Sequence, residues 1–177
     1  MQTKKLMKNI FLIFILFMIY VASVNAQAPG KKKSNNTFSL GAVIALPVGI
    51  FADIYSIGIG ISAQENFSIS KNTALTLSAA YNHFFFKSIY GKGGFDFIPV
   101  LAGAELNITP KVFASGQLGL TFYTEGGGKA FTYAPGLGFK LSKSFSAILK
   151  YVGRTSSGIN SGTVGLRLAY NFHKEEK

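Results

Sequence analysis

Residues 163–172 read Thr-Val-Gly-Leu-Arg-Leu-Ala-Tyr-Asn-Phe. Every second side chain from Val164 to Phe172 is apolar or aromatic, and the side chains between them are small or polar, with a full charge at Arg167. Because successive side chains of a β-strand point to opposite faces, this stretch predicts a strand with one apolar and one polar face. Its aromatic end favours the closing strand of a barrel whose apolar face is turned to lipid.

Seven earlier stretches repeat this alternation. They are residues 37–46, 56–67, 74–86, 95–108, 111–123, 130–141 and 145–154. Each is long enough for the roughly 9–11 residues that a tilted strand needs to cross a bilayer. The sequence therefore predicts an all-β fold, an eight-stranded antiparallel up-and-down transmembrane β-barrel over residues 37–172.

The connections between these stretches alternate in character. Those after the second, fourth and sixth are short turns, whereas those after the first, third, fifth and seventh are longer and rich in glycine, the last covering residues 155–162. Short periplasmic turns and longer external loops are typical of outer-membrane barrels. A soluble lipocalin-like barrel is the alternative, but it would turn its apolar face inward. The polar face here carries Gly, Ser and Thr with few charges, which favours the membrane barrel.

The N-terminal region predicts export. Lys4, Lys5 and Lys8 precede an apolar run over residues 10–24 and small residues up to Ala26. This order is typical of a secretory signal peptide, residues 1–26, cut after Ala26. A retained anchor is the alternative, but the run is shorter than the roughly 20 residues of a helical span. We expect residues 27–36 to be a flexible periplasmic tail and residues 173–177 a C-terminal tail.

The net charge and the lack of cysteine indicate which classes of partner the protein can have. The chain carries a formal net charge of +11 and has no cysteine. A basic balance can indicate nucleic acid, which an exported chain rarely meets. Export without disulfides suits a Gram-negative envelope. We therefore expect outer-membrane lipid and anionic lipopolysaccharide as partners, no nucleic acid, and a monomer.

Three segments carry a family resemblance, residues 47–58, 97–103 and 131–138. They resemble the small outer-membrane β-barrel domain family, whose members include the OmpA/OmpX-type eight-stranded barrels. The resemblance implies this fold and a place in the cell outer membrane, and it implies no particular activity. The closing strand resembles the signal that the barrel assembly machinery reads, carried here by Leu166, Leu168, Tyr170 and Phe172.

The strand phases direct several polar side chains into the lumen. They are Gln64, Asn82, Glu105, Gln117, Lys140, Lys150 and Arg167. An eight-stranded barrel has an interior that side chains just fill, and buried charges need partners. We expect Glu105 to pair with Lys150 or Arg167. The network is then a structural plug or, alternatively, the lining of a small porin-like channel that favours anions.

A hypothesis of catalysis would rest on three residues, His83, Ser88 and Asp96. Barrel enzymes of similar size that modify lipid A use His with Ser and an acid at the outer rim, but no motif surrounds these three residues. Two histidines and no cysteine argue against a metal site. The sequence therefore predicts no catalytic, cofactor or metal residues. It favours a non-enzymatic protein that supports envelope integrity or surface interaction through external loops, with the channel and a lipid A-modifying enzyme as alternatives.

Overall fold

The computed structural model describes residues 36–124 and 126–173, with side chains up to Phe172. The predicted signal peptide, its cut after Ala26, the tail up to residue 35 and residues 174–177 lie outside the described residues.

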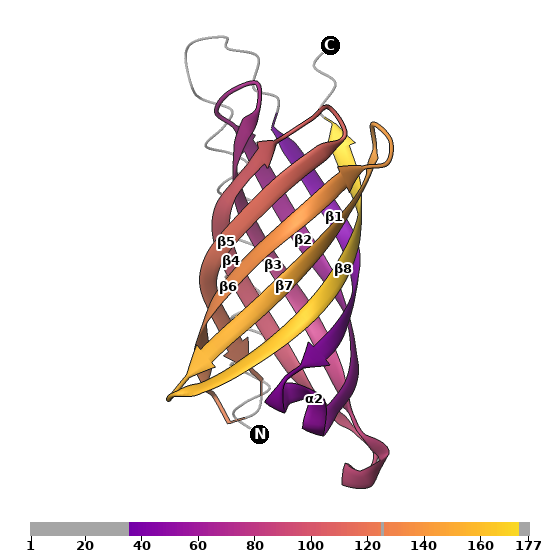
Figure 1. Cartoon of the computed structure of the whole chain (residues 1–177), viewed down its shortest axis with the longest axis vertical. Helices are drawn as coiled ribbons and strands as arrows, with labels where there is room; N and C mark the ends of the chain where they lie inside the picture. The colour runs from indigo at the N-terminus through magenta and orange to yellow at the C-terminus, as the bar shows by residue number, and fades with distance from the viewer. Residues whose placement is uncertain (1–35, 125, 174–177) are drawn as a thin grey trace, which may run out of the picture. The chain divides into compact units, whose positions relative to one another are not determined.

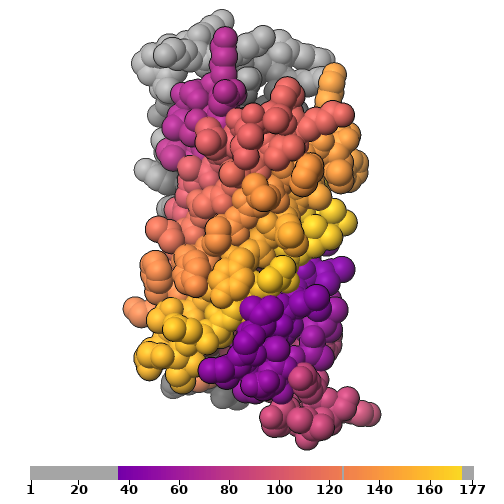
Figure 2. All heavy atoms as spheres, viewed as in Figure 1, coloured from indigo at the N-terminus to yellow at the C-terminus, as the bar shows by residue number. Residues whose placement is uncertain are grey.

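Eight strands close into one antiparallel barrel in which each strand pairs with its neighbours in the chain and β8 pairs with β1 (Figure 1). The space-filling view shows β8, in yellow, directly against β1, in indigo, in diagonal bands that follow the tilt of the strands (Figure 2). The predicted fold class is confirmed. The strands are β1 Thr37–Val48, β2 Tyr55–Ser68, β3 Thr73–Phe86, β4 Gly94–Asn107, β5 Val112–Tyr123, β6 Lys129–Lys140, β7 Phe145–Ser156 and β8 Ile159–His173.

The predicted phase of the strands is also confirmed. Large apolar side chains point out of the barrel, with Ile61 70% exposed and Leu149 56% exposed. Their polar neighbours point inward, so that Gln64 and Thr132 are buried. This is the inverse of a soluble barrel, in which burial of apolar surface drives folding. A continuous apolar exterior of this extent indicates a surface made for contact with lipid or protein.

The two ends of the barrel differ. Three four-residue turns, at residues 69–72, 108–111 and 141–144, lie at the end where β1 begins and β8 finishes; we call this the turn end. At the opposite end, the loop end, a short helix, α2 (Ile50–Ile54), connects β1 to β2, and a 3-10 turn, η1 (Ser88–Tyr90), lies between β3 and β4. No helix in the described part of the chain is long and apolar enough to cross a membrane.

One predicted loop is wrong. Residues 155–162 form no long connection; β7 and β8 continue to a two-residue hairpin at Ser157 and Gly158. Both residues have positive φ, 49° and 81°, as tight hairpins that match the strand twist require. The Thr155 hydroxyl donates to Asn160 Oδ1 across the hairpin at 2.9 Å. The expected alternation of short turns and longer loops therefore fails at this connection.

Candidate functional site

The lumen near the turn end is organised around one carboxylate. Glu105 of β4 accepts a hydrogen bond from Gln64 Nε2 at 2.8 Å and another from Asn66 Nδ2 at 2.9 Å. It forms no ion pair with any described lysine or arginine. The predicted pairing of Glu105 with Lys150 or Arg167 is not formed as a contact, because two side-chain amides from β2 occupy the carboxylate oxygens. Glu105 interacts with both cations only electrostatically, at longer range.

Two glutamines connect the cation and the carboxylate that the sequence predicted to touch. The Lys150 ammonium donates to Gln117 Oε1 at 2.7 Å, and Gln117 Nε2 makes a long contact of 3.5 Å with Gln64 Oε1. Gln64 Nε2 in turn reaches Glu105. Each amide turns its oxygen toward the positive group and its nitrogen toward the negative one. Aligned dipoles of this kind stabilise both charges at low dielectric without direct contact.

Arg167 has its own partners on β1 and β2. Its Nε donates to Ser62 Oγ at 2.7 Å, and Nη2 donates to Ser39 Oγ at 2.9 Å. The side chain is 5% exposed. Its guanidinium is therefore hydrogen-bonded to β1 and β2 across the β8 seam, and its charge has no carboxylate in contact within the described structure.

The remaining predicted lumen residues lie at different heights. Asn82 is buried against Gly60 in the half of the barrel nearer the loop end. Lys140 is exposed at the turn end, where its ammonium donates to Asn107 Oδ1 at 2.7 Å. A cavity of about 530 Å³ occupies this end of the lumen. Its walls include Ser39, Asn66, Glu105, Lys140, Arg167 and Asn171.

The loop end of the lumen is filled by aromatic rings. Phe51 of α2 packs edge-to-face against Phe84 of β3 and Phe97 of β4, with ring centroids 5.4 and 5.5 Å apart, and Phe84 and Phe97 are 5.3 Å apart. All three are at most 8% exposed. Tyr55 and Tyr123 pack around them. We call Phe51, Phe84 and Phe97 the aromatic plug, because they fill the lumen beneath α2 and pack in favourable edge-to-face geometry.

A buried arginine lies beneath the aromatic plug. The guanidinium carbon of Arg154 is 5.9, 5.8 and 5.1 Å from the ring centres of Phe51, Phe84 and Phe97. The side chain is 3% exposed. Sequence reasoning placed this residue at the end of a strand and left it out of the lumen set. The only signal in the sequence was its position four residues beyond Lys150, which places both side chains on the inward face of the strand.

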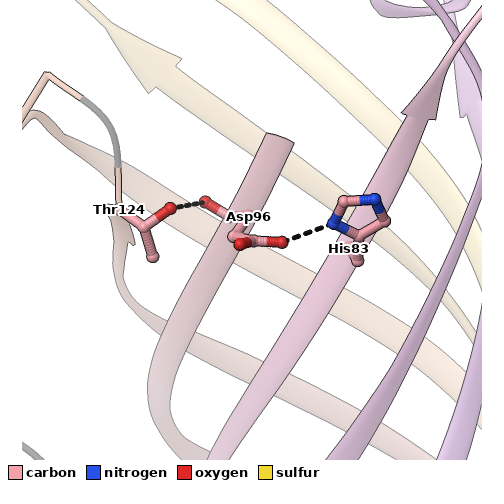
Figure 3. Close-up of polar contacts among 3 residues, drawn as sticks. All are labelled: His83, Asp96 and Thr124. Atoms are coloured by element: carbon pink, nitrogen blue, oxygen red, sulfur yellow. Dashed lines mark hydrogen bonds and ion pairs between the residues drawn. The ribbon is translucent and has the colours of Figure 1, made fainter. Parts of the chain in front are cut away.

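His83 and Asp96 meet on the outer surface rather than in the lumen. His83 Nδ1 and Asp96 Oδ1 are 2.6 Å apart across β3 and β4, and the Thr124 hydroxyl donates to the Asp96 carbonyl oxygen at 3.4 Å (Figure 3). The His83 ring packs against Phe85. Ser88 is the third residue of the hypothesis of catalysis. The pair therefore links β3 to β4, and in the described structure it makes no hydrogen bond with the candidate nucleophile Ser88.

The described residues contain no group of three or more side chains that could hold a metal ion. The side chains of the predicted assembly signal, Leu166, Leu168, Tyr170 and Phe172, all face outward and are between 42% and 51% exposed. Tyr170 and Phe172 are in edge contact, with ring centroids 4.8 Å apart. Recognition of this strand by the assembly machinery stays a prediction.

Comparisons with known proteins agree on the fold. No protein-family model and no curated protein matches the sequence. One similar structure is that of the outer-membrane protein Ail of Yersinia pestis in a phospholipid bilayer nanodisc. Its TM-score is 0.59 at 18% sequence identity, and the match covers 79% of this chain and 100% of that one. A crystal structure of Ail in complex with the heparin analogue sucrose octasulfate is also similar. Its TM-score is 0.57 at 19% sequence identity, and the match covers 78% of this chain and 99% of that one. The N-terminal β-barrel domain of Pseudomonas aeruginosa OprF matches with a TM-score of 0.55, 12% identity, and 79% and 100% coverage. At these identities the likeness establishes the fold that the resemblance implied.

Proposed function

We propose that the chain is a non-enzymatic outer-membrane barrel whose loop end faces outward and binds anionic saccharide at the cell surface. The exposed apolar exterior and the fold shared with outer-membrane barrels support the location. The proposal includes export by a signal peptide cut after Ala26 and a periplasmic turn end. It takes surface interaction rather than transport as the task.

The filled loop end of the lumen is the observation that carries this choice. The aromatic plug and α2 close the loop end, and the 530 Å³ cavity belongs to the turn end alone. A molecule outside the cell therefore meets loops and no opening. Loops on a rigid scaffold are where binding residues concentrate.

One loop offers a surface suited to binding. Residues 87–93 project beyond the rest of the loop end (Figure 2). Ile89 in this loop is 79% exposed and Tyr90 is 55% exposed. The loop is held in place, because Lys87 N donates to the Ile54 carbonyl at 2.9 Å and Phe86 N donates to the Gly93 carbonyl at 3.0 Å. Its exposed rings and methyl groups are thus presented on an ordered backbone.

The charges around the loop favour an anionic ligand. Three lysines are exposed at this end, Lys87, Lys92 and Lys129. Among the described residues, Asp53 is the only exposed acid. Lysines supply the counter-charge, and the exposed Tyr90 ring supplies a flat apolar face. Sulfated or phosphorylated saccharide combines both features. Binding of a heparin analogue by Ail, on the same fold, is consistent with this ligand class.

Binding of the refolded barrel to immobilised heparin tests the proposal. We expect the double variant Lys87→Gln/Lys92→Gln to bind at least about tenfold more weakly, and wild-type binding to weaken as salt screens the charges. The double variant Lys140→Gln/Lys143→Gln removes the same charge at the turn end and should bind like wild type. Equal losses in both double variants would mean that net charge alone drives binding, and the loop would have no special role.

A further inference from the structure

The Arg154 guanidinium has unmet hydrogen-bonding capacity in a buried place. Its Nε and Nη1 atoms have no hydrogen-bond partner in the described structure. The faces of Phe84 and Phe97 stabilise the positive charge, but they satisfy none of the in-plane N–H groups. A buried charge without a polar partner is strongly unfavourable. Something that accepts hydrogen bonds is therefore expected beside it.

A cavity lies at this arginine, on the inner side of the aromatic plug. Its volume is about 80 Å³. Its wall holds three cations, Lys150, Arg154 and Arg167, and no carboxylate. Asn82, Ser78 and Thr163 also line it. The cavity has room for a few water-sized species, since one water needs roughly 10–15 Å³ by this measure.

The lumen carboxylate offsets the charge of this cavity only in part, because it acts on Lys150 and Arg167 from outside the cavity wall. Glu105 is absent from its wall, and both oxygens of Glu105 are engaged by amides nearer the turn end. Lys150 and Arg167 have neutral hydrogen-bond partners, and Arg154 has none at Nε or Nη1. Glu105 therefore offsets part of the charge of Lys150 and Arg167, whereas Arg154 has no carboxylate in ion-pair contact in the described structure.

We propose that this cavity is a binding site for a small inorganic anion of the chloride type. The Arg154 guanidinium, which lines the cavity, holds the anion, and the charges of Lys150 and Arg167 raise its affinity. Its size excludes phosphorylated lipids and saccharides, which separates this site from the external loop. This cavity neighbours the 530 Å³ one, because Gln64 and Arg167 line both, so we expect the anion to enter from the turn end past these two side chains. The bound anion links the walls of the barrel beneath the aromatic plug and stabilises the fold.

Thermal unfolding in matched salts tests the site. The refolded mature chain is compared in sodium chloride, sodium bromide and sodium gluconate at equal ionic strength, gluconate being too large to enter. We expect a saturable rise in Tm of several degrees with chloride or bromide, as binding to the folded state alone requires. Arg154→Met should lose this rise, and Lys143→Gln, a charge change outside this cavity, should keep it.

Diffraction with bromide gives a readout that does not depend on a variant. Crystals of wild-type protein grown in bromide should show an anomalous peak in this cavity beside the Arg154 guanidinium. Absence of that peak, or equal Tm values in chloride and gluconate, would overturn the proposal and leave a cavity that holds water only. If Arg154→Met fails to fold, the wild-type peak and the wild-type salt response decide the matter.

Discussion

Gly58 in β2 is the sharpest test of how tightly the aromatic plug is packed. Its Cα faces the lumen, and a Cβ there would overlap ring carbons of Phe84. That ring is tightly held, because it is 1% exposed and packs against both Phe51 and Phe97 at centroid distances of 5.4 and 5.3 Å. Overpacking of a filled interior by one methyl group costs about 1–3 kcal/mol. We expect Gly58→Ala to lower the free energy of unfolding by that amount.

Gly165 in β8 provides the matched control. It is also buried and faces the lumen, but a Cβ there would lie 3.4 Å from the Cβ of Ala45, an ordinary contact. Gly165→Ala should change the free energy of unfolding by less than about 0.5 kcal/mol, or raise it slightly by restricting the unfolded chain. Urea unfolding of the barrel in lipid vesicles, followed by the mobility shift between folded and unfolded forms on gels, measures both variants.

A double-mutant cycle separates steric overlap from other causes. Phe84→Ala alone should cost about 3–5 kcal/mol, as deletion of a buried ring does. In Gly58→Ala/Phe84→Ala the new methyl group enters the space that the ring has left, so the double variant should cost no more than Phe84→Ala. Contacting residues are expected to be non-additive in this way. Additive costs, or a Gly58→Ala variant as stable as wild type, would refute the packing argument.

Other expectations concern the polar network, and urea unfolding measures each. Glu105→Gln should lower the free energy of unfolding by about 1–3 kcal/mol, because it removes the charged acceptor of two side-chain amides. Gln117→Leu should cost about 3 kcal/mol, because it leaves the Lys150 ammonium without its acceptor; a neutral result would mean that water replaces the amide. Lys140→Met should stay within about 0.5 kcal/mol of wild type, since the Lys140–Asn107 contact is exposed, and a larger loss would contradict that placement.

The wall of the barrel was predictable because alternation carries its own geometry. A period of two assigns each side chain to a face, and the scarcity of charge on the polar face decides which face is inside. Residues 163–172 show this most clearly, since Arg167 lies inward and Leu166 and Leu168 lie outward as expected. The three short turns, at residues 69–72, 108–111 and 141–144, were equally predictable, because they contain Ser, Asn, Thr and Pro.

The interior contacts were not predictable, because they depend on height along the barrel axis. Glu105 and Lys150 share the inner face, but strand tilt and register place two glutamines between them. Phe84 and Phe97 also occupy the face that was expected to be polar. The one hint was the small partner, since Gly58 pairs with Phe84 in the β2–β3 register. A helix after β1 that supplies Phe51 leaves no periodic signal over so few residues.

Single-channel recording of the mature chain, residues 27–177, in a planar bilayer tests the central claim most directly. The claim is that the aromatic plug and α2 seal the lumen at the loop end. A barrel shown to be folded by its gel mobility should be electrically silent across the voltage range. Discrete conductance steps in the wild-type protein would contradict the sealed lumen, and they would move the function from the outer loop to a channel.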